Sequence, residues 1–326
     1  MSAWRARLAA SWRAAFVVLV GGWLAWVLLS GEFGPAPRPG TWLQVQTGLF
    51  LAGWLALPLG LGLLWRWNLQ LLTAIRLPLA LLLTTQGLAW GGRYLPGKSG
   101  LWLAKLSISR RSGIDLRTLG WAVLVEQGLF VLAGALVFIV LLPWSDIAAR
   151  VAWQHPALSA LQALAAHPLF GPARILFAIA LAAVGLAAMR IGKAALPEGA
   201  RWPDWSQWLL LLAGHLVLHL TIGLALAPLL WLLLPDSAAL LGTSGIIAAL
   251  ALANIAGILA LFAPAGLGVR EVVLAGLLAA GADYPKALAV AAFLRLVTFL
   301  ADVAFSTSAW AAGMLIGRGL ESRASD

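Results

Sequence analysis

Long apolar runs separated by short polar or Pro- and Gly-containing segments dominate the hydropathy pattern of this chain. There are eight such runs, at about residues 14–30, 42–64, 72–92, 118–142, 174–190, 206–234, 238–262 and 286–317. A helix needs roughly 20 residues to cross the hydrocarbon core of a bilayer, and most of the runs reach that length. The pattern therefore predicts an all-α, polytopic membrane bundle of about eight long helices, formed by residues 1–326 as one integral membrane domain.

Two shorter stretches, 93–112 and 263–281, interrupt this pattern. Each begins with Pro and Gly and carries charge at apparent membrane depth, and the residues expected to break the backbone are Pro96, Gly97, Gly100, Pro264, Gly266 and Gly268. Lipid offers no hydrogen-bond partner to irregular backbone, so protein or water must cover such a break. We expect two re-entrant or broken segments, and short amphipathic pieces at one interface over 143–173.

The two broken stretches are related by a constant offset. At a spacing of 168 residues, the pairs that coincide are Pro96 with Pro264, Gly100 with Gly268, Gly113 with Gly281 and Asp115 with Asp283. This favours an internal repeat, with repeat A at about 72–142 and repeat B at about 240–310. The alternative is coincidence in a chain that holds 34 Gly and 16 Pro.

The basic residues favour one orientation of this repeat. Of the 22 Lys and Arg, four are left uncounted within the membrane: Arg93, Lys98, Lys105 and Arg295. If each broken region crosses the membrane an even number of times, 13 of the others fall on one side and 5 on the other; an odd number gives 9 and 9. Cytoplasmic loops carry the excess of Lys and Arg, so the even topology is preferred. It makes the repeat inverted, an arrangement found in alternating-access transporters. Both topologies leave the two termini inside, so we expect a bacterial cytoplasmic (inner) membrane protein with both termini cytoplasmic.

Composition excludes several other kinds of function. Hydrophobic residues make up 62% of the chain and charged residues 10%, so the net charge of +10 fits contact with anionic headgroups better than with nucleic acid. No Cys is present, which removes thiolate and Cys-ligated metal chemistry. Gly92-x4-Gly97-Lys98-Ser99 has the P-loop spacing, but an apolar helix is expected where a P-loop needs a strand. We predict no cofactor, and no enzymatic activity.

His215 and His219 lie one helical turn apart in an apolar run. Two imidazoles alone do not make a metal site, and no Glu lies between them in the pattern of zinc hydrolases. We expect a hydrogen bond between helices there, and no metal.

Two sequence signatures resemble those of a known family. Residues 93–100 (RYLPGKSG), followed by Lys105 and Glu126, are similar to an LPGxxGG stretch followed by a basic residue and a helix carrying Glu-Arg. Residues 264–271 (PAGLGVRE), followed by Arg295, are similar to PGGxGxRE. This family is the transmembrane, flippase-like domain of lysylphosphatidylglycerol synthases and its stand-alone relatives. The resemblance covers most of the chain and implies lipid translocation or handling without the aminoacyl-transferase domain.

The sequence departs from these signatures at three positions. Leu101 and Ala265 replace glycines, and Gln127 stands where Arg often follows the Glu. The last departure removes the charge pair that the family pattern has at that point.

The charged residues inside the apolar runs are the candidate site. Lys98, Lys105 and Arg270 lie on or just after the breaks, where helix N-termini suit phosphate, although snorkelling toward headgroups also explains them. Each charge at mid-bilayer costs roughly 2.5–3.5 kcal/mol and needs a partner. The offset places Arg295 opposite Gln127, beside Glu126, which predicts a cross-repeat pair in a polar cleft or a structural salt bridge.

Two further carboxylates complete this set. Asp302 is a second possible partner of Arg295, and Glu271 is expected to orient Arg270 or to cap a short helix.

These residues predict a protein that translocates or handles an anionic phospholipid or a polyprenyl-linked lipid across the cytoplasmic membrane. One alternative is a non-catalytic membrane partner of a glycosyltransferase or lipid synthase. Another is a membrane-embedded lipid-phosphate transferase, which requires acid–base pairs or Asp-rich metal motifs that the sequence does not display.

Overall fold

Helices form every regular element in the part of the chain that the structure describes, which confirms the all-α class. The computed structural model describes residues 22, 26, 40, 44–150, 163–165, 167–191, 196–197 and 200–325. Its elements are α2 (Val45–Thr73), α3 (Leu79–Gly92), η2 (Pro96–Lys98), α4 (Ser99–Leu106), α5 (Ser109–Ser112), α6 (Leu116–Leu141), α7 (Trp144–Arg150), α9 (Phe170–Ile191), α10 (Trp205–Leu233), α11 (Pro235–Leu259), η4 (Pro264–Gly266), α12 (Val269–Leu278) and α13 (Tyr284–Ser325).

Within the described ranges, six helices are long and apolar enough to cross a bilayer: α2, α6, α9, α10, α11 and α13. This is the property of a multi-pass membrane protein. The predicted count of about eight is not reached within these ranges, and of the run 14–30 only Gly22 and Trp26 are described. The run 72–92 gives only the 14 residues of α3, about 21 Å of helix, against a hydrocarbon core of roughly 30 Å.

The chain leaves the helix at Ala74, which adopts a left-handed conformation with φ 59° at the end of α2. Helix resumes only after Pro78, because a residue that precedes proline disfavours the helical conformation. This interruption is the reason that the apolar run 72–92 falls short of a complete span.

Side-chain caps start two of the long helices. Asp115 accepts from the backbone amide of Arg117 at 2.7 Å and thereby caps α6. Asp204 caps α10 and forms a reciprocal capping box with Gln207. The hydroxyl of Ser206 and the backbone amide of Gln207 donate to the Asp204 carboxylate and lower the pKa of that carboxyl below its ordinary value. Both helices therefore begin where the sequence leaves its polar loops.

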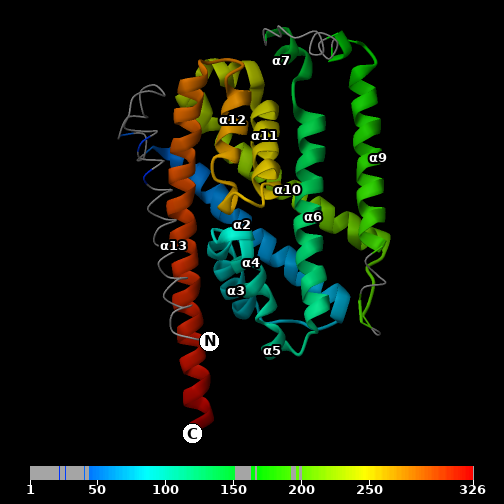
Figure 1. Ribbon diagram of the computed structural model, residues 1–326, viewed down its shortest axis with the longest axis vertical. Coiled ribbons are helices and arrows are strands. Elements are labelled where there is room, and N and C mark those ends of the chain that lie inside the picture. The colour runs from blue at the N-terminus through cyan, green and yellow to red at the C-terminus, as the bar shows by residue number, and fades with distance from the viewer. Residues whose placement is uncertain are drawn as a thin grey trace.

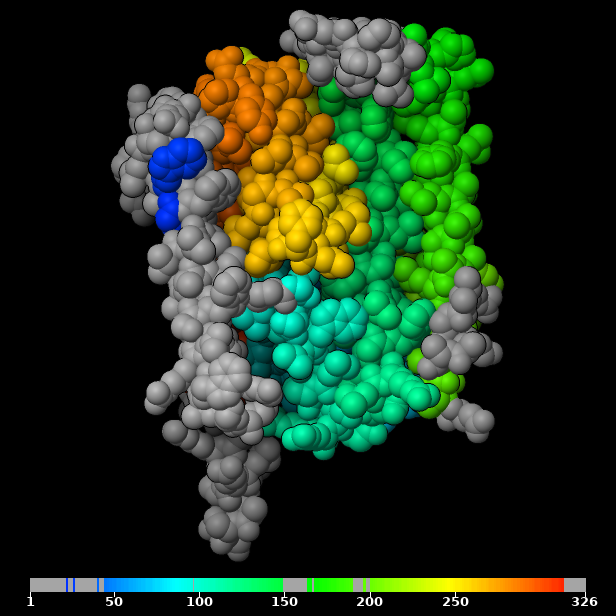
Figure 2. All heavy atoms as spheres, in the orientation of Figure 1, coloured from blue at the N-terminus to red at the C-terminus, as the bar shows by residue number. Residues whose placement is uncertain are grey.

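Two helical hairpins occupy opposite halves of the bundle. Helices α3 and α4, joined by η2, lie in the lower half of Figure 1, and α11 and α12, joined by η4, lie in the upper half. The tips of the hairpins meet, because the backbone amide of Ala265 donates to the carbonyl oxygen of Arg93 at 3.0 Å. Figure 2 shows the same division on one face, with the yellow and orange second half above the cyan first half.

Glycine allows the two arms of each hairpin to touch. A Cβ on Gly92 would lie 2.4 Å from the carbonyl carbon of Gly100, and a Cβ on Gly266 would lie 2.5 Å from the Cα of Gly257. Real Cβ atoms do not approach other atoms so closely, so backbone packs directly on backbone at both places. In both hairpins, therefore, a pair of glycines allows the backbones of the two arms to be in direct contact.

Gly100→Ala is expected to destabilise the protein by about 1–3 kcal/mol, the usual cost of overpacking, because the new methyl group would lie 2.6 Å from the carbonyl oxygen of Gly92. Gly120→Ala is the matched control, since nothing lies within 4 Å of its Cβ position in α6, and it should be neutral or stabilising by up to about 1 kcal/mol. Thermal unfolding of both variants in detergent checks this, and equal melting temperatures would contradict the close contact.

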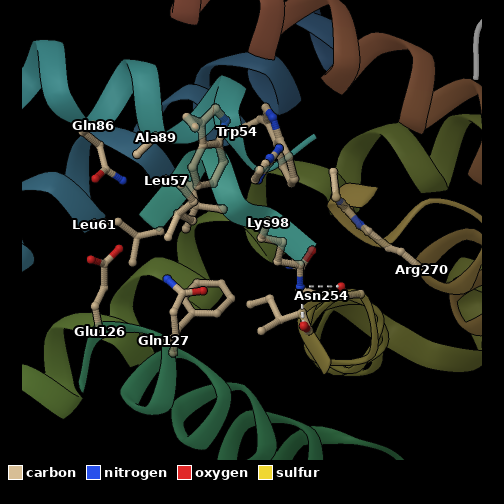
Figure 3. Close-up of a pocket in the computed structure, with 17 residues that line it drawn as sticks. Trp54, Leu57, Leu61, Gln86, Ala89, Lys98, Glu126, Gln127, Asn254 and Arg270 are labelled. Atoms are coloured by element: carbon tan, nitrogen blue, oxygen red, sulfur yellow. Dashed lines mark hydrogen bonds between the residues drawn. The ribbon is translucent and has the colours of Figure 1, made fainter. Parts of the chain in front are cut away.

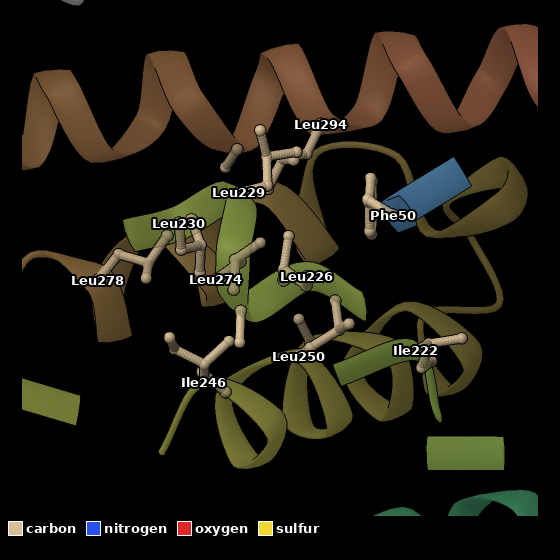
Figure 4. Packing of buried hydrophobic residues seen from close by; sticks show 14 of the residues in the cluster. Phe50, Ile222, Leu226, Leu229, Leu230, Ile246, Leu250, Leu274, Leu278 and Leu294 are labelled. Atoms are coloured by element: carbon tan, nitrogen blue, oxygen red, sulfur yellow. The ribbon is translucent and has the colours of Figure 1, made fainter. Parts of the chain in front are cut away.

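A continuous apolar core joins the second hairpin to the rest of the bundle. Figure 4 shows side chains from α2, α10, α11, α12 and α13 packed together, and those labelled are Phe50, Ile222, Leu226, Leu229, Leu230, Ile246, Leu250, Leu274, Leu278 and Leu294. Leu229, Leu230 and Leu278 are completely buried. This packing fixes α12, and with it the second break, relative to the long helices.

Candidate functional site

A cavity of about 70 Å³ lies where the hairpin tips meet. Its polar lining includes Gln86, Arg93, Lys98, Glu126, Asn254 and Arg270, while Trp54, Leu57 and Leu61 supply apolar walls. Figure 3 shows Arg270 on one side of the pocket, Gln86 and Glu126 on the other, and Lys98 and Asn254 between them. The structure thus brings Lys98, Arg270 and Glu126, which are far apart in the sequence, around one cavity.

The backbone of the two breaks has the same unusual conformation at corresponding positions. Gly97 and Lys98 have φ of 61° and 55°, and Ala265 and Gly266, 168 residues later, have φ of 50° and 73°. Side chains other than Gly pay roughly 1–2 kcal/mol for this left-handed region, so Lys98 and Ala265 occupy strained positions. Gly268 follows with φ 80°.

The remaining predicted break residues have ordinary helical roles. Pro96 and Pro264 begin the two short 3₁₀ turns, and Gly100 is the second residue of α4. Glycine is needed at position 100 because the backbone of Gly92 lies too close for a side chain, and not because of a positive φ.

Lys98 is buried and joins the first break to the second hairpin. Its Nζ donates to the carbonyl oxygen of Gly257 at 3.1 Å and to that of Ile258. These carbonyls belong to the last turn of α11, the negative end of that helix, where a cation is favoured. Lys98 therefore caps a helix in addition to lining the cavity.

Arg270 lies in the first turn of α12 and has only 8% of its surface exposed. Its guanidinium carbon stands 4.4 Å from the ring centroid of Trp54, which is a cation–π contact. No hydrogen bond or ion pair joins its side chain to any residue of the described ranges. A desolvated cation without a carboxylate partner thus faces the cavity.

The carboxylate of Asp302 on α13 accepts hydrogen bonds from four side chains. One lies on α2, one on α3 and two in the turn that follows α3. The donors are the indole nitrogens of Trp54 and Trp90 at 2.9 and 2.6 Å, the hydroxyl of Tyr94 at 2.6 Å and the guanidinium of Arg93. Arg93 also lies over the ring of Trp90, at 3.7 Å from its centroid. These hydrogen bonds connect the end of α3 and the first break to α13.

Two other ion pairs connect each short helix to the long helix that follows it. Lys105 of α4 pairs with Glu126 of α6, and Glu271 of α12 pairs with Arg295 of α13 at 3.3 Å. The predicted Glu126–Arg295 pair across the repeats is wrong, as is the pairing of Arg295 with Asp302, which bonds Arg93 instead. The reason is that α4 packs on α6 and α12 packs on α13, so each long helix offers a nearer partner.

Glu271 caps the short helix α12, which is the second of the two roles expected for it from the sequence. One of its oxygens accepts from the backbone amide of Gly268 at 2.7 Å and caps α12. The other pairs with Arg295, and no ion pair within the described residues joins Glu271 to Arg270. Arg270 is thus left free to meet a ligand.

Several residues of the cavity were not singled out from the sequence. In the sequence, Arg93 stands out only as part of the first signature, and Asn254, Gln86 and Trp54 belong to no motif. The signal that was available is a lone amide inside an apolar run, since a buried polar group needs a partner. Gln86 Oε1 and Asn254 Nδ2 are buried and have no hydrogen-bond partner.

The two histidines take up structural contacts. His219 Nε2 lies 3.0 Å from the carbonyl oxygen of Phe130 and so joins α10 to α6, the predicted bond between helices. His215 Nδ1 lies 2.7 Å from the carbonyl oxygen of Leu211 in its own helix. Among the residues that the structure describes, no group of three or more His, Asp or Glu side chains is placed to hold a metal ion.

Comparison with known proteins adds no relative to this picture. No protein-family model matches the chain, no curated protein matches it, and no solved structure matches it. The resemblance to the flippase-like domain family therefore rests on the two signatures of the sequence.

Proposed function

We propose that this protein binds an anionic membrane lipid where the two hairpins meet and carries its headgroup across the cytoplasmic membrane. The observation that supports this best is Arg270, a buried cation without a carboxylate partner in a cavity between two hairpin tips. A charge costs roughly 2.5–3.5 kcal/mol in the middle of a membrane helix, so its retention without a carboxylate partner favours an anionic ligand.

The arrangement of the hairpins supports alternating access. In this proposal the two hairpins are re-entrant segments of an inverted repeat, each approached from a different leaflet. Figure 1 supports it, because α5, with Arg110 and Arg111, lies at the same end of the bundle as the C-terminal end of α13. The positive-inside rule then makes that end cytoplasmic, as the even-crossing topology requires.

The candidate residues divide into two roles. Arg270 is the principal contact for the lipid phosphate, and Lys98 adds positive charge beside it. Lys105, Glu126, Glu271, Arg295 and Asp302 are held in ion pairs, and they shape the cavity or gate access to it. The resemblance to the flippase-like family supports a lipid, rather than a soluble anion, as the cargo.

Purified protein reconstituted into vesicles is expected to scramble fluorescent anionic phospholipids, and Arg270→Ala is expected to slow this at least tenfold, because a buried charge–phosphate contact is worth about 2 kcal/mol or more. The measurement is the fraction of labelled lipid that a membrane-impermeant reductant bleaches over time.

Lys286→Gln is the matched control, since it removes an exposed cation from the start of α13. It should scramble at the rate of the unaltered protein. Well-assembled protein that scrambles no phospholipid or polyprenyl-linked lipid would refute the proposal. Co-purification of one defined lipid-modifying enzyme with such an inactive protein would instead support the role of a non-catalytic partner.

A further inference from the structure

The charges in and around the cavity do not balance. The cations, all buried or nearly so, are Arg93, Lys98, Lys105, Arg270 and Arg295. The buried carboxylates are Glu126, Glu271 and Asp302. Each carboxylate already has a cation of its own. Two positive charges, those of Lys98 and Arg270, therefore remain without a partner of opposite charge among the described residues.

Helix ends do not remove this surplus. The C-terminus of α11, which Lys98 caps, carries roughly half a negative charge. The N-terminus of α12, where Arg270 lies, carries about the same positive charge, and it belongs to the same break. The two contributions roughly cancel, so the site still lacks about two negative charges.

A neutral donor in the same cavity also lacks a partner. Asn254 has 7% of its surface exposed, lines the cavity, and has a buried Nδ2 without an acceptor. It lies three residues before Gly257, and thus on the same face of α11 as the carbonyl that Lys98 binds. Leaving such a donor unsatisfied costs about 1–3 kcal/mol, which an acceptor oxygen of a ligand would recover.

The size of the cavity limits the ligand. At about 10–15 Å³ for each water-sized group, a volume of about 70 Å³ holds roughly five to seven of them. A phosphate group has five non-hydrogen atoms, whereas a diphosphate has nine and a hexose twelve. The cavity therefore has room for one phosphate group.

Because a phosphomonoester approaches two negative charges near neutral pH and a diester has one, the charge deficit distinguishes the two. We propose that the cavity binds the terminal phosphate of a phosphomonoester, with Arg270 and Asn254 as hydrogen-bond donors and Lys98 as a second charge. This rests on the proposed function and deepens it, since the cargo would then be a lipid monophosphate. Free inorganic phosphate shares this chemistry and is the other source.

Calorimetry on the full chain in detergent tests the proposal with three probes: dihexanoyl phosphatidate, dihexanoyl phosphatidylglycerol and inorganic phosphate. We expect phosphatidate to bind at least about tenfold more tightly than the diester phosphatidylglycerol. Inorganic phosphate binding as tightly as phosphatidate would identify the free ion as the ligand, and much weaker binding would identify the lipid. Equal affinity for the monoester phosphatidate and the diester phosphatidylglycerol, or no binding of phosphatidate or inorganic phosphate, overturns the proposal.

Two variants and a control locate the site. Arg270→Gln should weaken phosphatidate binding about 30-fold or more. Asn254→Asp, which has nearly the same shape, should weaken it at least about tenfold while leaving the melting temperature of the free protein equal or higher, because the new carboxylate meets the surplus positive charge. Lys286→Gln should bind normally. Unchanged affinity in Asn254→Asp would overturn the proposal even if Arg270→Gln does not fold.

Calorimetry and the scrambling assay together separate the two proposals. Scrambling of diester lipids without any preference for a monoester would refute the monoester site and leave lipid translocation standing. Monoester binding that depends on Asn254 and Arg270, in a protein that scrambles no lipid, would refute translocation and leave the site standing.

Discussion

Asp302→Ala is expected to lower the free energy of unfolding by about 3–5 kcal/mol, the cost of breaking a buried ion pair from one side. The substitution leaves Arg93 as an unpaired charge and deprives two indole N–H groups and the hydroxyl of Tyr94 of their acceptor. Thermal unfolding of the purified protein and the yield of monodisperse protein measure this loss.

Asp146→Ala serves as the control, because that carboxylate is exposed in α7 and its removal should change stability by less than about 1 kcal/mol. The double substitution Arg93→Met with Asp302→Leu should recover part of the lost stability, since an apolar pair can replace a buried ion pair. If Asp302→Ala melted like Asp146→Ala, the carboxylate cluster would not hold the first break to α13.

Removal of one partner of the Lys105–Glu126 pair is the second prediction with a large effect. Lys105 is completely buried and its ammonium lies 4.4 Å from the ring centroid of Trp65, while Glu126 is 2% exposed. Lys105→Met and Glu126→Gln should each cost about 3–5 kcal/mol, because each leaves the opposite charge buried and alone.

A double-mutant cycle gives the decisive measurement for this pair. The combined Lys105→Met/Glu126→Gln variant should be more stable than the sum of the single losses predicts, by more than about 1 kcal/mol, since it leaves no isolated charge. Strictly additive losses would show that the two groups are not coupled. Arg66→Met, on the half-buried side chain of an arginine outside these pairs, is the reference for loss of a cation alone.

The architecture could be predicted from the sequence wherever it depends on local chemistry. Run length identified the long helices, and the Pro and Gly residues marked both breaks, because proline and left-handed glycine stop a helix whatever surrounds them. The apolar run 72–92 is long enough to predict a full membrane span, but it contains Pro78. Here the residue before proline interrupted a run whose overall hydropathy was high enough.

The partners of the charges could not be predicted, because spacing along one helix does not determine which side chain lies across from it. The 168-residue offset places Arg295 beside Glu126 in the expected repeat. In the structure, however, Glu126 pairs with Lys105 on α4, and Arg295 pairs with Glu271 on α12. Asp302 gathers donors that are more than 200 residues away in the chain. Arg93 and Asn254 are candidate site residues only because the hairpin tips meet and place both side chains around the cavity.

The Lys105–Glu126 and Glu271–Arg295 ion pairs have opposite polarity, because the cation lies on the short helix in the first pair and on the long helix in the second. Each pair couples a short helix to a long one. The bonds between the two hairpin tips are the Ala265–Arg93 backbone bond and the Lys98 bonds to the end of α11, while Asp302 links the first break to α13. Because α3 also packs on α13 and α6 packs on α11, any movement of one hairpin against the other must slide these helix surfaces as well as break the bonds at the tips.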